Sequence, residues 1–373
     1  MTESALPIPL IDLSGESERH VMVAAGTEEA YYCSPTTVLM PDGRTIYCAF
    51  SYEHGGRCGP LKNSTDGGLT WSGLLPVPDN WGTVQNCPTS YRLTDPLGTS
   101  RLLVFAGRAG TQLRAGPENT MHQAHSSDDG RTWTPMASNG LECVMPFCSI
   151  LPIDGGARLL GITNIRRDED PNNRKPMTPS GHVGNRIAQS VSEDGGLTWS
   201  RWRITLDCPP RIPGEPELIR SPDGRQILCL LRDNTGRWEY TSRSLFITSD
   251  DEGETWSEPR ELPLGLTGDR HRHRHSRDGR LLVTMRNTAP GCPERGDLTL
   301  WVGTYDDILA GREGQYRVRL LTSHAGFDGS YSSIELLPDD TFMVATYVKY
   351  RPGSERQSIV SVRFKLPELD ALL

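Results

Sequence analysis

An eight-residue box, STDGGLTW at residues 64–71, decides how this sequence is interpreted. Its pattern, S-x-D-x-G-x-T-W, returns at residues 126–133 (SSDDGRTW), 192–199 (SEDGGLTW) and 249–256 (SDDEGETW). Asp and Ser side chains bond backbone amides inside tight turns, and Gly adopts backbone angles that are costly for other residues. The Trp then packs the turn against neighbouring strands. We interpret the boxes as structural turns without a catalytic role.

A second repeat alternates with the boxes: an aspartate turn, usually Asp-Gly, followed by an apolar strand. Apolar runs also precede most of these turns, so each turn is interpreted as a hairpin of two short strands. The six turns begin at Asp42, Asp95, Asp154, Asp223, Asp278 and Asp339. Six hairpins, each followed by further strand material, predict an all-β fold, a six-bladed β-propeller with four-stranded antiparallel blades.

The two ends of the chain complete this prediction. Residues 20–24 (HVMVA) are expected to form the outer strand of the last blade, beside residues 358–364 (SIVSVRF), which hides the sheet edges. Helical periodicity is almost absent, and ELDALL at residues 368–373 is a weak helix candidate. We expect a single domain over residues 1–373.

Composition narrows the classes of function. The formal net charge is −8, whereas proteins that hold nucleic acid by its phosphates are usually basic. No apolar stretch is long enough to span a membrane, and the N-terminus does not resemble a secretory signal. The nine cysteines are scattered without a CxxC pair, which favours reduced thiols and a cytoplasmic location. We expect no cofactor.

The hairpin turns also locate the start of each inner strand, where a propeller lines one mouth of its central axis. Strands are usually about five to six residues long, so these positions are expected about eight residues before each turn. They are Ser34, Cys87, Pro146, Glu215, Arg270 and Tyr331. The second strands end at Arg108, Arg166, Arg232 and Arg286. Arginines bind carboxylates in bidentate fashion, so we expect an anionic small-molecule or oligosaccharide substrate that carries a carboxylate.

The boxes on a six-bladed propeller resemble the sialidase (neuraminidase) superfamily from about Tyr32 onward. GEPEL at residues 214–218, running to Arg232, resembles the sialidase Glu-Pro strand that ends in an arginine. Arg295, in ERGDLTLW, is similar to the last arginine of the family's triad, and GSYSS at residues 329–333 resembles the strand of the nucleophilic tyrosine.

The resemblance implies a glycosidase mechanism. Tyr331 would be the nucleophile, and Glu215 would be the base that takes its proton, because a free tyrosine with a pKa of about 10 is a poor nucleophile. Arg232 and Arg295 would bind the substrate carboxylate. Arg57, Arg166 and Arg270, with Asp269, are further candidates for substrate binding.

Two features of the family are missing. Cys33 stands where the first arginine of the triad belongs, and the loop at residues 51–63 lacks the expected acid/base aspartate. Glu53, His54 and Arg57 are the candidates for replacement within that loop.

Candidates for the general acid also lie outside that loop. His271 ranks slightly above Glu53 as the acid, and Asp269 comes third. His271, His273 and His275 share one face of a strand, but the arginines between them and the lack of nearby acids on that face argue against a metal site.

Three functions therefore remain open. The first is a sialidase-like exo-glycosidase that acts on a terminal acid sugar. The second is a propeller lyase that acts on uronic-acid glycans, with Tyr and His as base and acid. The third is a non-catalytic carbohydrate-binding propeller.

Overall fold

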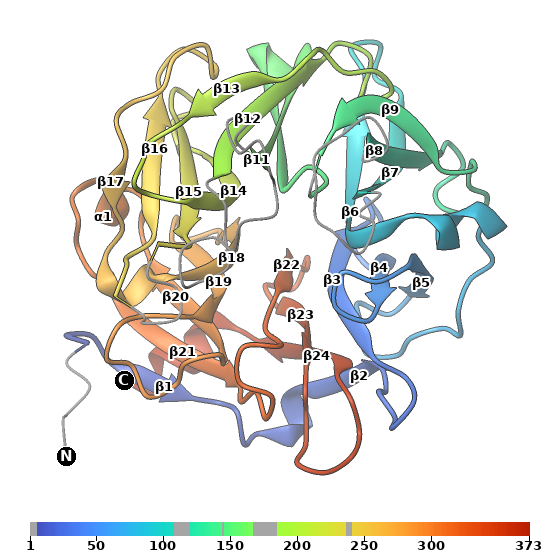
Figure 1. Cartoon of the computed structure of the whole chain (residues 1–373). Helices are drawn as coiled ribbons and strands as arrows, with labels where there is room; N and C mark the ends of the chain where they lie inside the picture. The colour runs from blue at the N-terminus through green and yellow to red at the C-terminus, as the bar shows by residue number, and fades with distance from the viewer. Residues whose placement is uncertain (1–5, 108–119, 144, 167–184, 236–240) are drawn as a thin grey trace. The chain divides into compact units, whose positions relative to one another are not determined.

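The computed structural model describes residues 6–107, 120–143, 145–166, 185–235 and 241–373. Almost all regular structure in these residues is β-strand (Figure 1). The strands form six sheets in which sequential neighbours pair antiparallel. This is the fold class of a six-bladed β-propeller, as predicted.

The chain divides into two compact units, each of which is described by itself. The first comprises residues 1–54, 60–75 and 261–373, and the second residues 55–59 and 76–260. The expectation of a single domain stays a prediction.

The first unit contains the first, fifth and sixth blades. The first blade has three strands, β3 (Tyr32–Leu39), β4 (Ile46–Tyr52) and β5 (Cys58–Ser64). The fifth has β18 (Gly268–His275), β19 (Leu281–Asn287), β20 (Leu298–Gly303), β21 (Tyr316–Leu321) and a parallel fifth strand, β1 (Leu10–Asp12). The sixth has β22 (Ser332–Leu336), β23 (Phe342–Val348), β24 (Ser358–Phe364) and β2 (His20–Ala24). The predicted pairing of residues 20–24 with residues 358–364 is confirmed.

The second unit contains the second, third and fourth blades, with four strands each. They are β6 (Gln85–Thr94), β7 (Ser100–Gly107), β8 (Thr120–Ser126) and β9 (Ala137–Glu142); then β10 (Ser149–Ile153), β11 (Arg158–Arg166), β12 (Asn185–Ser192) and β13 (Arg203–Leu206); then β14 (Pro213–Arg220), β15 (Ile227–Asp233), β16 (Leu245–Ser249) and β17 (Arg260–Glu261). All six aspartate turns join the first two strands of a blade, so the hairpin prediction is confirmed in every blade.

The helices are few and short. α2 (Leu366–Asp370) confirms the weak C-terminal candidate, whereas α1 (Tyr305–Leu309) was not anticipated. α1 begins with a capping box in which the Thr304 side chain accepts from the Asp307 amide and the Asp307 side chain accepts from the Thr304 amide. The described residues also contain four 3₁₀ turns, at Ser17–Arg19, Asp79–Thr83, Asp154–Gly156 and Leu264–Leu266.

The four sequence boxes begin where the third strands β5, β8, β12 and β16 end. In the second box the Ser126 hydroxyl accepts from the Gly130 amide at 2.8 Å, and Asp128 accepts from the Thr132 amide at 2.9 Å and its hydroxyl at 2.6 Å. Because these bonds satisfy the turn internally, the boxes act as the structural turns that the sequence predicted.

The apolar core lies between successive blades. In the second unit, for example, Phe147 of the third blade packs its ring 5.3 Å from Phe105 of the second blade, and the box residue Trp199 lies 4.2 Å from Phe147 (ring centroids). A Cβ at Gly161 would lie 2.6 Å from Phe147 and 2.8 Å from Trp199, so only glycine fits there. The box residue Trp199 thus packs its turn against neighbouring strands, as the sequence predicted.

Candidate functional site

A β-bulge interrupts the start of the inner strand in four blades. The register shifts fall between Cys33 and Thr36, Gln85 and Thr89, Gly214 and Glu217, and Asp269 and Arg272. At each of them a non-glycine residue has a left-handed backbone: Ser34 (φ 49°), Cys87 (φ 44°), Glu215 (φ 49°) and Arg270 (φ 54°). These are four of the six positions that the sequence assigned to the mouth. Bulges and strained backbone of this kind re-aim side chains and cluster at functional sites.

In the first unit, Arg286 connects the fifth and sixth blades. It is the penultimate residue of β19 and is 1% exposed. It donates to Asp269 Oδ2 from Nε at 3.1 Å and from Nη2 at 2.7 Å. Nη2 also donates to the Tyr331 hydroxyl at 3.1 Å, and the guanidinium lies 4.5 Å from the centre of the Tyr331 ring. The Tyr331 oxygen is therefore next to a buried cation.

Arg286 also holds the chain that leads to Tyr331. Its Nη1 donates to the backbone carbonyl of Phe327 and, at 3.3 Å, to that of Gly329. The residue between them, Asp328, therefore has a fixed backbone position.

Asp328 is the acceptor for three side chains. The Tyr31 hydroxyl donates to Oδ1 at 2.5 Å, Gln357 Nε2 donates to Oδ2 at 2.7 Å, and His54 Nδ1 lies 3.2 Å from Oδ1. Burial alone would raise the pKa of Asp328, but the hydrogen bonds from His54 and Tyr31, together with the charge of Arg286, lower this pKa overall. Asp328 is therefore an anion that orients its neighbours.

Cys33 packs in the same part of the first unit. It is fully buried and packs with Tyr31, Tyr331, Tyr347 and Phe50. Tyr347 is stacked near Tyr31 with ring centroids 6.5 Å apart, and meets the Tyr331 ring edge to face at 6.1 Å. Where the resemblance called for an arginine, this chain therefore has a small buried thiol that belongs to the same cluster as the candidate nucleophile.

In the second unit, Glu215 and Arg232 form a buried ion pair. Arg232 Nη1 lies 2.7 Å from Glu215 Oε2, and both side chains are less than 10% exposed. The Glu215 amide donates to Asn164 Oδ1 at 3.1 Å, which anchors the bulge to β11. An ion pair favours the carboxylate form of Glu215, the form that can accept a proton.

The same design thus occurs in two blades. Gly214 pairs in register with Arg232, and Asp269 with Arg286, at the ends of equivalent strands. In each blade an arginine at the end of the second strand pairs with an acid from the bulge of the first strand.

The other predicted residues are placed as follows. His271 is buried, and its Nε2 lies 3.1 Å from the Leu266 carbonyl oxygen. Glu53 is 64% exposed, with Arg356 Nη1 3.5 Å from its Oε1. Arg270 is buried, whereas Arg57 and Arg295 are exposed. Arg166 ends β11, and its side chain lies outside the described residues, as does Arg108.

The sequence did not identify Asp328, Tyr31 or Gln357. It named His54 as a candidate to replace the acid/base aspartate, and it named Arg286 only among the arginines expected to face an anionic substrate. Asp328 immediately precedes the GSYSS segment, which was the available signal. Within the described residues, no group of three or more His, Cys, Asp or Glu side chains is arranged to hold a metal. In the same part of the chain, no helix is long and apolar enough to cross a membrane.

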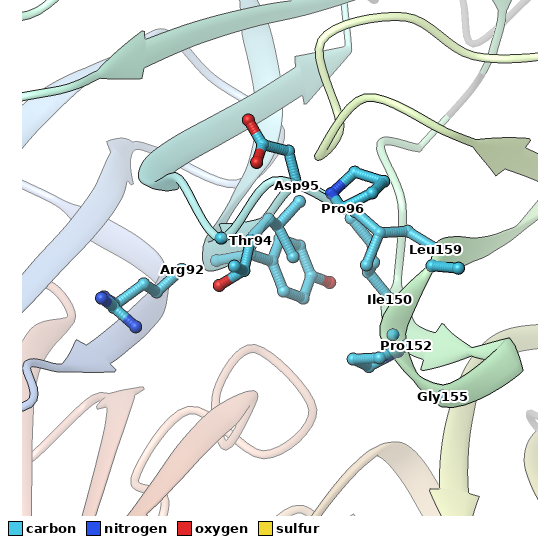
Figure 2. Close-up of a pocket in the computed structure, with 13 residues that line it drawn as sticks. Arg92, Thr94, Asp95, Pro96, Ile150, Pro152, Gly155 and Leu159 are labelled. Carbon is cyan, nitrogen blue, oxygen red and sulfur yellow. The ribbon is translucent and has the colours of Figure 1, made fainter.

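A pocket of roughly 550 Å³ lies at the other end of the inner strands in the second unit. Figure 2 shows Asp95 and Pro96 on one side and Pro152 and Gly155 on the other, from the hairpin turns of the second and third blades. The Asp95 carboxylate accepts from the amides of its own turn and from Arg101. We therefore assign this pocket no part in the candidate site.

Comparison with known proteins gives divergent relatives. No family model matches the chain. A sialidase from Micromonospora viridifaciens is 26% identical over 209 residues, which are 50% of this chain and 31% of that protein. The α-L-arabinanase of Penicillium chrysogenum, solved with arabinobiose, has a TM-score of 0.63 at 16% identity and covers 94% of this chain and 98% of its own. The NanB sialidase of Streptococcus pneumoniae has a TM-score of 0.61 at 12% identity, and the match covers 93% of this chain and 70% of NanB. The chain thus has the propeller fold of known glycoside hydrolases.

Proposed function

We propose that this divergent relative of the sialidases is an exo-glycosidase that removes a terminal carboxylate-bearing sugar, sialic acid or a related acid sugar, from a glycan. The observation that carries the proposal is the hydroxyl of Tyr331 beside the buried Arg286 guanidinium, 3.1 Å from Nη2. A cation next to the phenol favours the phenolate and so makes the oxygen a better nucleophile.

The roles follow from the chemistry of each group. Tyr331 attacks the anomeric carbon, and its proton passes to Glu215 as the glycosidic bond breaks. The departing oxygen takes a proton from a general acid. A nucleophile that begins as a neutral hydroxyl avoids repulsion from a carboxylate on the same sugar.

Arg232 and Arg295 are proposed to bind the substrate carboxylate, with Arg57, Arg166 and Arg270 as further cations. Arg232 forms an ion pair with Glu215 in the structure. To bind the substrate, its guanidinium would exchange the Glu215 carboxylate for the substrate carboxylate. Arg295 is exposed in the turn that precedes β20. The proposed partner is a small molecule or an oligosaccharide.

Product analysis tests the proposal. The protein is incubated with aryl α-glycosides of N-acetylneuraminic acid and aryl glycosides of uronic acids, and the products are separated by chromatography. Release of a free sugar acid supports the exo-glycosidase. An unsaturated product with new ultraviolet absorbance would replace it by a lyase, and binding without turnover would replace it by a carbohydrate-binding propeller.

A further inference from the structure

We propose that His54, oriented by Asp328, is the general acid and base of the site. This inference rests on the proposed glycosidase function. It names the proton donor of the loop at residues 51–63, which has no aspartate to serve as one. Three features of the first unit support it: the position of His54, the network that holds Asp328, and the connection of that network to Tyr331.

His54 is placed for contact with a bound molecule. Its side chain is 62% exposed, while its Nδ1 lies 3.2 Å from Asp328 Oδ1. The preceding residue, Glu53, has a left-handed backbone (φ 60°), and its amide donates to the Tyr31 carbonyl at 3.0 Å. The chain therefore turns sharply just before His54, which directs the imidazole toward Asp328.

Asp328 fixes which imidazole nitrogen does the chemistry. A carboxylate that accepts from Nδ1–H holds the ring in one orientation and leaves Nε2 as the reactive nitrogen. The Asp328 carboxylate is itself held by Tyr31 on Oδ1 and by Gln357 on Oδ2. With both oxygens bonded, Asp328 acts as a positioning residue for His54.

The dyad is connected to the nucleophile through one side chain. Arg286 bonds the carbonyls on either side of Asp328 and donates to the Tyr331 hydroxyl. Asp328 and Tyr331 are three residues apart on the same segment. The proton donor and the nucleophile are therefore held by a common framework, as a glycosidase needs on the two sides of one bond.

The charged groups around His54 come from four elements. They are Asp328 itself, Glu53 at the end of β4, Arg356 before β24, whose Nη1 lies 3.5 Å from Glu53 Oε1, and Arg286 of β19, whose charge acts on Asp328. The carboxylate of Asp328 is the one that contacts the imidazole.

The proton transfers balance over two steps. In the first, the Tyr331 oxygen bonds to the anomeric carbon while the glycosidic C–O bond breaks, Glu215 takes the phenolic proton, and Nε2–H of His54 protonates the leaving oxygen. In the second, water gives a proton to Nε2 as its oxygen bonds to the anomeric carbon. As that bond forms, the bond between the anomeric carbon and the Tyr331 oxygen breaks, and the phenolate recovers its proton from Glu215.

The decisive measurement is the dependence of rate on the leaving group. kcat/KM is measured for 4-nitrophenyl and phenyl α-glycosides of N-acetylneuraminic acid with the wild type, His54→Gln and Glu53→Gln. A good leaving group does not need protonation, so His54→Gln should lose about 10²–10⁴-fold on the phenyl glycoside and far less on the 4-nitrophenyl glycoside. Glu53→Gln tests the other candidate acid of the same loop, and it should show no difference in effect between the two glycosides.

Asp328→Asn tests the positioning role. It should displace the pH profile of the phenyl glycoside reaction and lower kcat more than it raises KM, with a smaller loss than His54→Gln. NMR of the imidazole nitrogens adds a readout without substrate. The neutral ring should carry its proton on Nδ1 in the wild type and lose this preference in Asp328→Asn.

The outcomes separate this inference from the proposed function. If Glu53→Gln shows the leaving-group effect and His54→Gln does not, Glu53 is the acid and the inference is wrong, although the glycosidase stands. If no glycoside is hydrolysed, the proposed function fails, and with it the catalytic role of His54. A neutral imidazole that carries its proton on Nε2 in the wild type would overturn the dyad whatever the substrate.

Discussion

The box turns and the cluster around Tyr331 both contain aspartates and hydroxyl groups, but the hydrogen-bond partners of these groups are local in the boxes and distant in the cluster. In the second box, the partners of Asp128 lie at most four residues away in the chain. In the cluster, Arg286 bonds Asp269 and Tyr331, 17 and 45 residues away, and Tyr31 bonds Asp328 across 297 residues. The boxes therefore stabilise a turn by themselves, whereas the cluster exists only when the blades have assembled.

This difference separates stability from chemistry. Both carboxylate oxygens of Asp128 accept hydrogen bonds from the box itself, so this group stabilises the turn. In the cluster, residues that are far apart in the sequence fix the positions of the Tyr331 hydroxyl and of His54. The His54 imidazole nevertheless stays exposed. Each prediction below changes one group on one side of this comparison, beginning with the largest expected effect.

Replacing Tyr331 by Phe should abolish turnover with little effect on the fold. Phe keeps the ring that faces the Arg286 guanidinium and removes only the attacking oxygen, so kcat should fall by on the order of 10³-fold or more. The lost hydrogen bond should lower the free energy of unfolding by only about 1 kcal/mol. Steady-state rates and urea unfolding measure the two effects.

Tyr347→Phe is the matched control for this experiment. The Tyr347 hydroxyl is fully buried and has no hydrogen-bond partner among the described residues, although its ring meets that of Tyr331. This variant should keep its activity. Near-normal turnover by Tyr331→Phe would remove tyrosine as the nucleophile and leave the lyase or the binding propeller.

Replacing Asp269 by Asn should destabilise the protein strongly. The change leaves the Arg286 guanidinium, which is 1% exposed, without its counter-charge, and breaking one partner of a buried pair costs about 3–5 kcal/mol. Urea unfolding measures the loss. The double variant Asp269→Asn/Arg286→Met should recover part of it, because the buried charge is then gone. If the single variant loses less than the double, the ion pair is not what holds this region.

The contrast also explains what the sequence could predict. The boxes, the six hairpins and the pairing of His20–Ala24 with Ser358–Phe364 follow from local rules, in which turn residues and alternating apolar strands repeat at a regular interval. Counting back from the hairpin turns reached the bulged residues Ser34, Cys87, Glu215 and Arg270 for the same reason. Periodicity carries this information within each blade.

The partners of the site residues could not be predicted in this way. Nothing near Asp328 in the chain indicates that Tyr31 and Gln357 bond it. The Tyr31 contact joins the start of the first blade to the sixth, and the Gln357 contact joins two segments of the sixth blade that lie 29 residues apart in the chain. The helix α1 was missed for a different reason. Five residues are too few to show a helical period, and only its capping box marks it.

Removing one hydroxyl from a box should have a moderate effect on stability and none on chemistry. The Ser126 hydroxyl donates to Asp128 at 2.7 Å and accepts from the Gly130 amide, so Ser126→Ala leaves a buried amide unsatisfied. We expect the free energy of unfolding to fall by about 1–3 kcal/mol, measured by urea unfolding. Ser127→Ala, at the exposed neighbour, should stay within about 0.5 kcal/mol of the wild type. A large loss of turnover in Ser126→Ala would show that the boxes are not separate from the site.

The smallest effect should appear as an acid-dependent loss of stability from the boxes. Hydrogen bonds from Thr132 and Ser126 lower the pKa of Asp128 to about 2, against about 3.9 for an unfolded aspartate. The unfolded chain then binds more protons than the folded chain between these values. The contribution of Asp128 is therefore complete above about pH 4 and is lost as the pH falls toward 2. Urea unfolding at pH 5, 3.5 and 2.5 should show a steeper decline for the wild type than for Asp128→Asn, which has no carboxyl to titrate. If the free energy of unfolding declines equally with pH in both proteins, the turn does not stabilise the Asp128 carboxylate in the folded state.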